Sequence, residues 1–596
     1  MISDVHNENI LERRFAAMKN NKLIYRFGAV TCAVMLLATG CNFNLISEQN
    51  ISDNSYLYLE DDEDSLVTMY LTVTKGAEGG PTDHTWSEVN ANSVFYYQDL
   101  GIDRYQVEAI LQVGDENGPV EGSLGYGVSM PNAVVQIRGN TTSESEQKSF
   151  KIELNDDAGE WRDQSTIALN KHPYDFTRMK NKLAYDIIKD IPDMISFRTQ
   201  FVRLYVKDES SDAQNPQFVD YGLFTQVEQP NRRYLANHGL DKNGHFYKPG
   251  FFEFHRYEDE IKLIDDAGYD YASFERIIET KGNDDHTKLI GMLEELNDYD
   301  IPIETTFEKY FNSDNYFKWL AFQILTGNVD TLSRNYMLYS PEASIKWYFI
   351  TWDADMIFYW FEKVYRNEVV FGVPMPEDKF GHEVGISNYW GIVLHERVLK
   401  VPEYRERLDQ TINWMREKYL TEDKVKEWLA AYRPIVEDTL YAGVDREYLY
   451  LSQEEYDMLL DIIPTEIEKS YQFYKESLTK PMPFFVGVPE SYDDGGLRFI
   501  WASAYSFDNL RITYKVEIAE DSGFASDCIV LEQDGLAYPN LFIHMLPDGR
   551  YFIRITATDE NGNSQKAMAY CVDGNYLHRY GMIEFQIIDR EVKVGD

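Results

Sequence analysis

The sequence predicts an α+β fold: a β-rich lobe, then a mainly helical lobe, and then a separate β-sandwich. Between Ser65 and about Leu154, short β-rich runs alternate with Gly, Pro and Asn turns. Helical periodicity dominates the middle of the chain, and alternating strands return after Pro481. At 596 residues the chain is longer than one hydrophobic core usually organises, so we expect two or three domains.

The first lobe is predicted from period-2 runs at 66–76, 105–115, 133–140 and 148–154. A helix is expected over 175–191, where Met179, Leu183, Ile187 and Ile188 share one face after the candidate cap Asp175. Strands return at 201–208 and 221–229. The lobe therefore consists of strands with one helix.

The second lobe is predicted to begin with helices over 273–281, 286–298 and 313–327, the last capped by Ser313 and ended by Gly327. Two strands at 335–340 and 345–353 form a hairpin, and a second helical block follows from about Trp390 to Leu478. From residue 481 to 596, alternating strands with Pro-Asp-Gly and Asn-Gly turns resemble a fibronectin type III-like module. Such a module is usually a spacer or an interaction surface.

The charge of the chain limits its partners. Lys and Arg number 57 against 100 Asp and Glu, which gives a formal net charge of -43. Phosphate repulsion therefore disfavours nucleic acid as a partner. The charge fits a well-solvated exported protein, and a basic partner is compatible with it.

The N-terminus predicts export and lipidation. After the predicted start at Met18, basic residues precede an apolar run from Phe27 to Ala38, and Thr39-Gly40-Cys41 follows. The run is too short for a permanent membrane span, and it resembles a bacterial lipoprotein signal over residues 1–41 with lipid on Cys41. An uncleaved anchor would leave the small-small-Cys ending without a purpose. Residues 42–64 are interpreted as an acidic tether, which places the mature protein outside the membrane.

Two cysteines, Cys528 and Cys571, remain near the C-terminus. Export permits a disulfide between them, and two buried thiols are an equal alternative. Neither a CxxC pair nor an HExxH helix is present in the sequence, so a zinc site has no support.

The stretch "TGNVDTLSRNYMLY" carries the candidate chemistry. Asp330 and Asn335 have the D-x4-N spacing of a protein-kinase catalytic loop, and they lie between a predicted helix and a predicted strand. In that loop the carboxylate takes the proton of the acceptor hydroxyl and the amide binds a metal ion. The motif by itself is weak, since Asn335 alone would more often be a turn amide.

A second carboxylate pair makes the assignment more specific. The next strand ends in "ITWDADM", so Asp353 and Asp355 follow one hairpin after the loop, which is the kinase order for a metal carboxylate. If the strand continued, the two side chains would lie on one face of it. The alternative is a pair of Asp residues that caps a turn.

A nucleotide also needs local cations in such an acidic chain. Candidates for phosphate contacts are Arg138 in "IRGNTT", Arg178, Lys180 and Lys182 on the predicted helix 175–191, and the two strand lysines Lys148 and Lys151 in "KSFKIEL". Strand alternation lets only one of the two lysines point toward a cleft, and a solvated strand face is the alternative for each. The sequence has neither a Walker loop nor a GxGxxG loop here.

These segments resemble one known family. "QIRGNTTSESEQKSFKIELND", "DFTRMKNKLAYDI", "YGLFTQVEQPNRRYL", "GHFYKPG", "GNVDTLSRNYMLY" and "WYFITWDAD" occur in the order seen in the spore coat protein H (CotH) family of atypical secretory-type kinases. The resemblance implies a two-lobed atypical protein-kinase-like domain over 133–480, preceded by a β-rich segment over 65–132. It also implies ATP with Mg or Mn, and phosphorylation of Ser or Thr on exported proteins.

By motif match, Asp330 resembles the catalytic aspartate and Asp353 the metal aspartate, with Asp355 and Asn335 as further metal ligands. Glu228 matches the acidic residue of the family after a "GLF" strand. Two functions stay open: a lipid-anchored kinase acting on exported, coat or basic Ser-rich proteins, and a non-catalytic surface lipoprotein that binds proteins or glycans.

Overall fold

The computed structural model describes residues 50–59, 65–212, 214–376, 379–492, 495–572 and 578–593. The predicted signal, Cys41 and most of the predicted tether lie outside these ranges. The chain forms two compact units. The larger unit comprises Asn50–Tyr365 and Ile392–Tyr471, and the described part of the smaller one comprises Arg366–Gly391 and the chain from Gln472.

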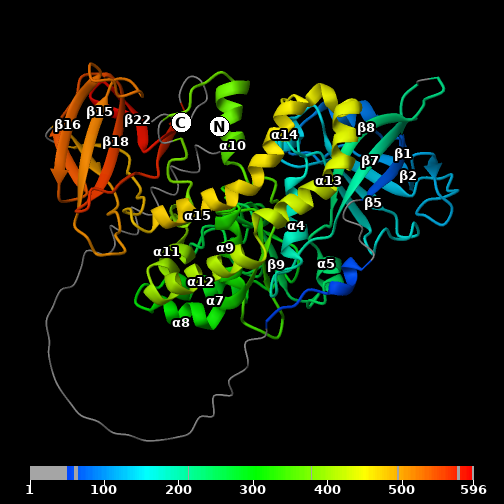
Figure 1. Ribbon diagram of the computed structural model, residues 1–596, viewed down its shortest axis with the longest axis horizontal. Coiled ribbons are helices and arrows are strands. Elements are labelled where there is room, and N and C mark those ends of the chain that lie inside the picture. The colour runs from blue at the N-terminus through cyan, green and yellow to red at the C-terminus, as the bar shows by residue number, and fades with distance from the viewer. Residues whose placement is uncertain are drawn as a thin grey trace, which may run out of the picture. The chain divides into compact units, whose positions relative to one another are not determined.

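An eight-stranded sheet forms one end of the larger unit (Figure 1). Its strand order is β1-β7-β8-β6-β5-β4-β2-β3, and β1 also pairs with β2, so the sheet closes on itself. The strands are β1 (Leu66–Thr74), β2 (Val107–Asp115), β3 (Gly118–Pro119), β4 (Ala133–Arg138), β5 (Ser149–Leu154), β6 (Thr166–Asn170), β7 (Thr199–Asp208) and β8 (Val219–Val227). The segment 65–132 is therefore part of the first lobe, because it supplies β1, β2 and β3.

Alternation places one side-chain set of these strands in a shared core, which includes Leu71, Val135, Ile152 and Val202. Two short helices that the sequence reasoning missed, α2 (Trp86–Ala91) and α3 (Val94–Leu100), add Trp86, Val89, Val94 and Tyr97 to that core. The opposite face of the sheet is left for the rest of the unit.

Helix α4 (Lys180–Ile188) packs on that opposite face. The ammonium of Lys182 lies 5.6 Å from the ring centroid of Phe201 on β7, and Tyr432 of α13 (Glu422–Ala442) meets the same ring edge-on. The helix begins later than predicted, with Met179 as its N-cap, although the Asp175 carboxylate accepts a hydrogen bond from Lys180 N. Every residue of α4 is buried, which fits a helix enclosed by two layers.

The second lobe contains a four-stranded sheet of order β10-β9-β11-β12. Its helices α7, α8, α11 and α12 lie at the end of the unit opposite the large sheet (Figure 1). The elements are α5 (Arg232–Asn237), β9 (His245–Pro249), α6 (Tyr271–Ile277), β10 (Ile278–Thr280), α7 (Thr287–Asn297), α8 (Ile303–Tyr310), α9 (Ser313–Leu325), β11 (Tyr336–Ser340), β12 (Tyr348–Thr351), α10 (Trp360–Tyr365), α11 (Val393–Leu399), α12 (Pro402–Lys418), α13 (Glu422–Ala442), α14 (Gln453–Ile462) and α15 (Glu466–Ser477), which continues into the smaller unit.

The helix predicted over 273–281 is wrong beyond Ile277. The next three residues form β10, which pairs with β9 through Ile278 opposite Pro249 and Glu279 opposite Lys248. Two consecutive β-branched isoleucines favour this change, and the exposed edge of β9 supplies the hydrogen-bond partners. Helix α9 is capped by Asn312, whose side chain accepts from Asn315 N, instead of by Ser313.

Besides a two-stranded sheet of β20 and β21, the described part of the smaller unit contains two antiparallel sheets, of order β13-β14-β17 and β16-β15-β18-β22-β23. They enclose one core that includes Leu497, Phe499, Trp501, Val516, Ile553 and Phe585. The strands are β13 (Glu490–Tyr492), β14 (Gly496–Ile500), β15 (Ile512–Ala519), β16 (Ile529–Leu536), β17 (Asn540–His544), β18 (Gly549–Asp559), β19 (Ser564–Lys566), β20 (Tyr570–Val572), β21 (His578–Tyr580), β22 (Met582–Ile588) and β23 (Glu591–Lys593). Cys528 and Cys571 are half-buried, and no disulfide joins them in this structure. Within the described ranges, none of the helices is both long and apolar enough to cross a membrane.

Candidate active site

The loop that carries Asp330 begins at a turn that requires glycine. Helix α9 ends at Leu325, and Gly327 follows with φ 59°. A Cβ on Gly327 would lie 2.6 Å from Nε1 of Trp360, the first residue of α10. Both the left-handed backbone and the close tryptophan therefore exclude a larger side chain here, and the chain leaves the helix at a fixed angle toward Asp330.

Asp330 is oriented by two side chains from its own loop. Asn335 Nδ2 donates to Asp330 Oδ2 at 2.6 Å, and Arg334 Nη2 donates to Oδ1 at 2.9 Å. Asn335 has φ 62°, a conformation that asparagine tolerates better than most residues, and β11 starts directly after it. The D-x4-N spacing thus produces a direct contact between the acid and the amide.

The second carboxylate pair lies in a turn and not on a strand. Strand β12 ends at Thr351, and Asp353 has φ 54°, so the expectation that Asp353 and Asp355 share a strand face is wrong. Helix α4 provides the reason, because it takes the backbone hydrogen bonds of this turn. Asp353 N donates to Tyr185 Oη at 3.0 Å, and Ala354 N donates to Asn181 Oδ1 at 3.2 Å.

A histidine orients Asp355. His172 Nδ1 lies 3.3 Å from Asp355 Oδ2, and its Nε2 lies 3.3 Å from Asn181 Nδ2. Because the Asn181 oxygen already accepts from Ala354 N, its NH2 group faces the imidazole and donates to Nε2. In the neutral ring the proton is then on Nδ1, which donates to Asp355. One carboxylate oxygen of Asp355 is fixed in this way, as in the histidine–carboxylate pairs around metal sites.

The carboxylates of the two loops influence each other. Burial raises the pKa of Asp353 to about 6, with a further increase from the Asp355 charge, while His172 and Arg138 oppose it. Burial also raises the pKa of Asp330, which Arg334 lowers in part. Asp330, Asp353 and Asp355 therefore form one site in which negative charge is concentrated and only partly neutralised.

The donors of this site fit a hard divalent cation. Carboxylate and amide oxygens are the ligands that Mg²⁺ and Mn²⁺ prefer, and the repulsion between Asp353 and Asp355 is relieved by positive charge. Among the residues that the structure describes, no group of three or more His, Cys, Asp and Glu side chains is placed to bind a metal by itself. Protein-kinase sites need fewer, because one Asp, one Asn and the phosphate oxygens complete the coordination.

Arg138 ends β4 and lies within electrostatic reach of Asp353. Lys151 shares its face of the sheet, because Gln136 is opposite Lys151 in the β4–β5 register and alternates with Arg138. Lys151 Nζ is 2.8 Å from Glu153. Lys148 Nζ instead donates to the carbonyl of Ser143 at 2.6 Å. Of the two candidate lysines, Lys151 shares the face that carries Arg138.

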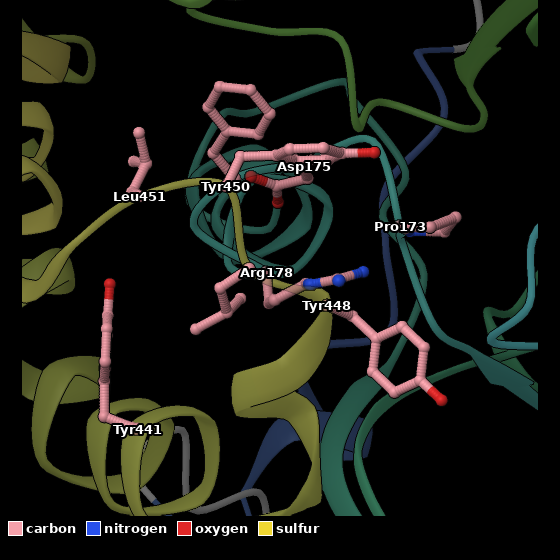
Figure 2. A pocket seen from close by; sticks show the side chains of 9 residues that line it. Pro173, Asp175, Arg178, Tyr441, Tyr448, Tyr450 and Leu451 are labelled. Atoms are coloured by element: carbon pink, nitrogen blue, oxygen red, sulfur yellow. The ribbon is translucent and has the colours of Figure 1, made fainter. Parts of the chain in front are cut away.

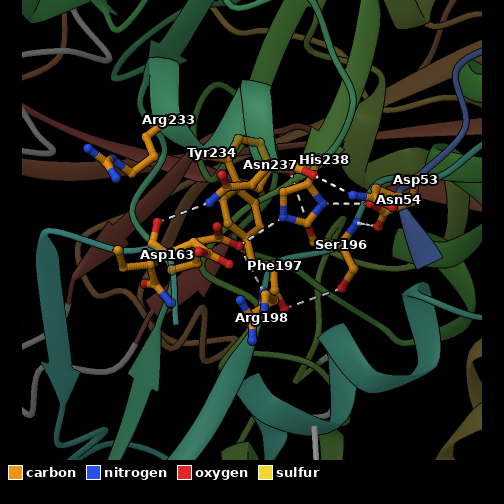
Figure 3. A network of polar contacts seen from close by, with 12 residues as sticks. Asp53, Asn54, Asp163, Ser196, Phe197, Arg198, Arg233, Tyr234, Asn237 and His238 are labelled. Carbon is orange, nitrogen blue, oxygen red and sulfur yellow. Dashed lines mark hydrogen bonds and ion pairs between the residues drawn. The ribbon is translucent and has the colours of Figure 1, made fainter. Parts of the chain in front are cut away.

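Glu228 lies in a different cluster. Its Oε2 is 2.8 Å from Nε2 of His238, whose Nδ1 is 2.6 Å from Asp53 Oδ1. Figure 3 shows the imidazole of His238 turned toward Asp53. Burial lowers the pKa of His238, but the Glu228 and Asp53 charges outweigh it and raise the value to about 9. The structure therefore places Glu228 against a buried imidazolium and does not bring it to the aspartates.

A small pocket lies beside the N-terminal end of α4 (Figure 2). Its lining residues are Pro173, Asp175, Phe176, Arg178, Tyr441, Tyr448, Leu449, Tyr450 and Leu451, and of these Arg178 was a candidate phosphate contact. Arg178 donates to the Lys171 carbonyl at 2.7 Å and to Gln147 Oε1 at 3.0 Å. The charged groups of this pocket are thus used within the fold.

Sequence reasoning missed His172, Asn181 and Tyr185. Asn181 and Tyr185 are four residues apart on α4, a spacing that predicts a shared helix face. It could not predict that this face meets the turn after β12, because that contact joins residues far apart in the chain.

Comparison with known proteins matches residues 135–474 to the family described as CotH kinase protein. The chain belongs to this family. A relative is "Inner spore coat protein H" of Bacillus subtilis (strain 168), which is 23% identical over 353 residues, or 58% of this chain and 87% of the relative. The match includes Arg138 and both aspartate loops, whereas β1, β2 and β3 precede it. The resemblance to this family that the sequence motifs indicated is confirmed.

Proposed function

We propose that this chain is a lipid-anchored extracytoplasmic kinase of the CotH family, which transfers the γ-phosphoryl group of ATP to Ser or Thr of exported or coat proteins. The observation that carries the proposal is the meeting of Asp330–Asn335 with the Asp353–Asp355 turn in one partly neutralised site. The name of the relative, an inner spore coat protein, supports a coat or extracellular location.

Asp353, with Asp355 and Asn335, would hold the metal. A bound Mg²⁺ or Mn²⁺ neutralises phosphate charge and orients the γ-phosphoryl group. Tyr185 and Asn181 fix the backbone of the turn, so the carboxylate of Asp353 is positioned before any ligand arrives. His172 limits the rotation of Asp355.

Asp330 acts on the acceptor. Its carboxylate receives the hydroxyl proton while the acceptor oxygen bonds to the γ-phosphorus, and the bond from that phosphorus to the β–γ bridging oxygen breaks to release ADP. Asn335 and Arg334 orient the carboxylate through the two contacts described above. Arg138 and Lys151, on one sheet face, supply positive charge for the phosphates. Lys148 and Glu228 receive no phosphate role in this proposal.

The smaller unit is proposed to be a fibronectin type III-like spacer. Near the start of β18, Tyr551 Oη donates to the carbonyl of Pro547 at 2.9 Å. Such a tyrosine corner is typical of immunoglobulin-like sandwiches. A chain that ends near Leu478 should still bind nucleotide, because every proposed site residue precedes that position.

The anchor is proposed to be lipid on Cys41. Labelled palmitate fed to producing cells should enter the wild-type protein and not Cys41→Ser. Equal labelling of both proteins would refute the lipid anchor without affecting the kinase proposal.

Phosphoryl transfer is tested by incubating residues 42–596 with labelled ATP, Mn²⁺ and a basic Ser-rich protein. We expect label on the acceptor with the wild type and background label with Asp330→Asn. Wild-type protein that remains folded but neither binds ATP nor transfers label would favour the other candidate function, a non-catalytic surface lipoprotein.

A further inference from the structure

Protein kinases contact the α- and β-phosphates with a strand lysine that is held by a glutamate. The lysine directly after β6, Lys171, does not fill this role here. Its Nζ is 2.6 Å from Asp445 Oδ1 and donates to the Tyr221 carbonyl at 2.6 Å, and the residue is 3% exposed. Lys171 is therefore engaged in a buried ion pair.

The lysines of α4 are also engaged. Lys180 Nζ is 2.7 Å from Glu362, and Lys182 Nζ is 2.8 Å from Asp186, with all four side chains at 8% exposure or less. If these lysines turned toward a phosphate, their buried carboxylate partners would be left without a counter-charge, which would strongly destabilise the fold. A phosphate-binding lysine must be sought outside β6 and α4.

Lys248 on β9 has the required surroundings. It is half-buried and lies directly opposite Glu279 of β10, with its Nζ 3.8 Å from Glu279 Oε2. The arrangement is a strand lysine with a glutamate beside it, at the edge of the sheet that also contains the β11–β12 hairpin. The Asp330 loop precedes β11 and the Asp353 turn follows β12, so both lie at the open end of this hairpin, where Tyr336 pairs with Thr351.

A row of aromatic rings connects the face of β9 that carries Lys248 to the residue before Asp353. Phe246, two residues earlier and on the same face, lies parallel to Tyr234 at 5.8 Å between centroids. Tyr234 stacks on Phe197 at 4.3 Å, and Phe197 meets Trp352 at 5.0 Å. Trp352 is the residue before Asp353. This row of rings therefore connects the strand of Lys248 to the aspartate turn.

The charges around Lys248 agree with this position. Burial lowers its pKa, and the nearby Glu279 and Asp353 charges oppose that shift while Lys281 and Arg138 add to it. Arg138 belongs to the large sheet and Lys248 to the small one, so cations from both lobes lie within electrostatic reach of Asp353. A polyphosphate bound at Asp353 would be bordered by positive charge from both sheets.

We propose that Lys248 is a further lysine that contacts the phosphates of the nucleotide, in addition to Arg138 and Lys151, and that Glu279 orients it. The inference rests on the proposed kinase function and adds to it a residue pair from β9 and β10. Glu279 does for Lys248 what a kinase glutamate does for its strand lysine, because one carboxylate restricts the long side chain and leaves further N–H donors for phosphate.

Lys281 provides a matched control. Its ammonium also bonds the Glu279 carboxylate, so Lys281→Met and Lys248→Met each remove one cation from the same glutamate. Only the second substitution removes the proposed phosphate ligand. Glu279→Gln keeps the shape of the side chain and removes the charge that orients Lys248.

The experiment is calorimetric titration of residues 42–596 with a non-hydrolysable ATP analogue in Mn²⁺, and with adenosine. We expect Lys248→Met to weaken binding of the analogue by roughly 10-fold or more, the scale of one lost charge-assisted contact. Adenosine affinity should stay within about twofold, because adenosine has no phosphate. Glu279→Gln should weaken the analogue by a smaller factor, and Lys281→Met should change it by less than about threefold.

The failures can be told apart. If the wild type binds the analogue and Lys248→Met binds it equally well, the inference is wrong and the kinase proposal stands. Equal losses in the two lysine variants, or a parallel loss of adenosine affinity, would also overturn the assignment of Lys248. A folded wild-type protein that binds no nucleotide would overturn the kinase proposal, and this inference with it.

Discussion

Two acidic clusters in the larger unit differ in how their charge is balanced. At the candidate active site, burial and mutual repulsion raise the pKa of Asp353 to about 6, and the pKa of Asp330 is raised as well. In the other cluster, His238 lies between Asp53 and Glu228. Burial would raise the pKa of Asp53, but the His238 charge and its hydrogen bond outweigh it, so the value is lowered.

The difference separates a structural role from a functional one. A buried imidazolium with a carboxylate on each side has its charge balanced within the protein. Its hydrogen bonds link the segment around Asp53 to Glu228. The aspartates of the candidate active site lack such a balance, so an added cation stabilises them. Groups with this kind of perturbed pKa are typical of functional sites.

The largest expected effect is the loss of transfer in Asp353→Ala. Removing this carboxylate should abolish the metal-dependent step, so labelled phosphate on the acceptor should fall to background. Transfer by folded Asp353→Ala at more than about a tenth of the wild-type rate would contradict the metal role of this residue.

The second prediction concerns the balanced cluster. His238→Ala leaves two carboxylates buried without their partner, so the free energy of unfolding in denaturant should fall by about 3–5 kcal/mol. Adding Asp53→Asn to this variant should recover part of the loss, because one stranded charge is removed. A loss below about 1 kcal/mol would mean that His238 is not the counter-charge of this cluster.

Asp330→Asn should lower the transfer rate by roughly 10²-fold or more, the usual scale for a positioned general base. Nucleotide affinity should change by less than about twofold, because the residue acts on the acceptor. Asp314→Asn, which removes an exposed carboxylate near the start of α9, is the matched control and should keep wild-type transfer. Unchanged transfer in Asp330→Asn would exclude it as the base.

His172→Ala should raise the Mn²⁺ concentration needed for half-maximal transfer by about 10-fold or more, because Asp355 loses the group that orients it. Transfer at saturating Mn²⁺ should recover most of its rate. His286→Ala removes a buried histidine that bonds Tyr247 and should leave the Mn²⁺ dependence unchanged. A purely structural role for His172 would lower transfer equally at all Mn²⁺ concentrations.

The smallest effect is a pH dependence of stability. The pKa of His238 is raised to about 9, above its value of roughly 6.5 in an unfolded chain. Its contribution is therefore fully present below pH ~6.5 and is lost as the pH rises through about 9. Between pH 6 and pH 9.5, the melting temperature should fall more for the wild type than for His238→Gln. Equal falls would contradict the charged state of His238.

The sequence predicted the parts of the site that are local. Asp330, Asn335 and Asp353 follow from spacing and from one helix and one hairpin, and the structure joins Asp330 to Asn335 directly. Strand positions in the first lobe were predicted well by alternation, since β1, β2, β4 and β5 all lie within the predicted runs.

The parts of the site that the sequence could not predict depend on contacts between distant segments of the chain. The turn at Asp353 is set by Tyr185 and Asn181, which lie about 170 residues earlier in the chain. Lys248 lies near the same turn only because β9 pairs with β11. Glu228 matched the family motif in sequence, yet its side chain lies on His238, which no pattern in the sequence indicates.

The contrast between the two clusters is tested most directly by calorimetric titration of a non-hydrolysable ATP analogue with Mn²⁺ into three proteins: wild type, Asp353→Asn and Glu228→Gln. Each substitution removes one charge and nearly preserves side-chain shape. We predict that Glu228→Gln binds within about threefold of the wild type and that Asp353→Asn shows no metal-dependent binding. Normal binding by Asp353→Asn, or lost binding by a folded Glu228→Gln, would contradict the assignment of Asp330, Asp353 and Asp355 as the nucleotide and metal site.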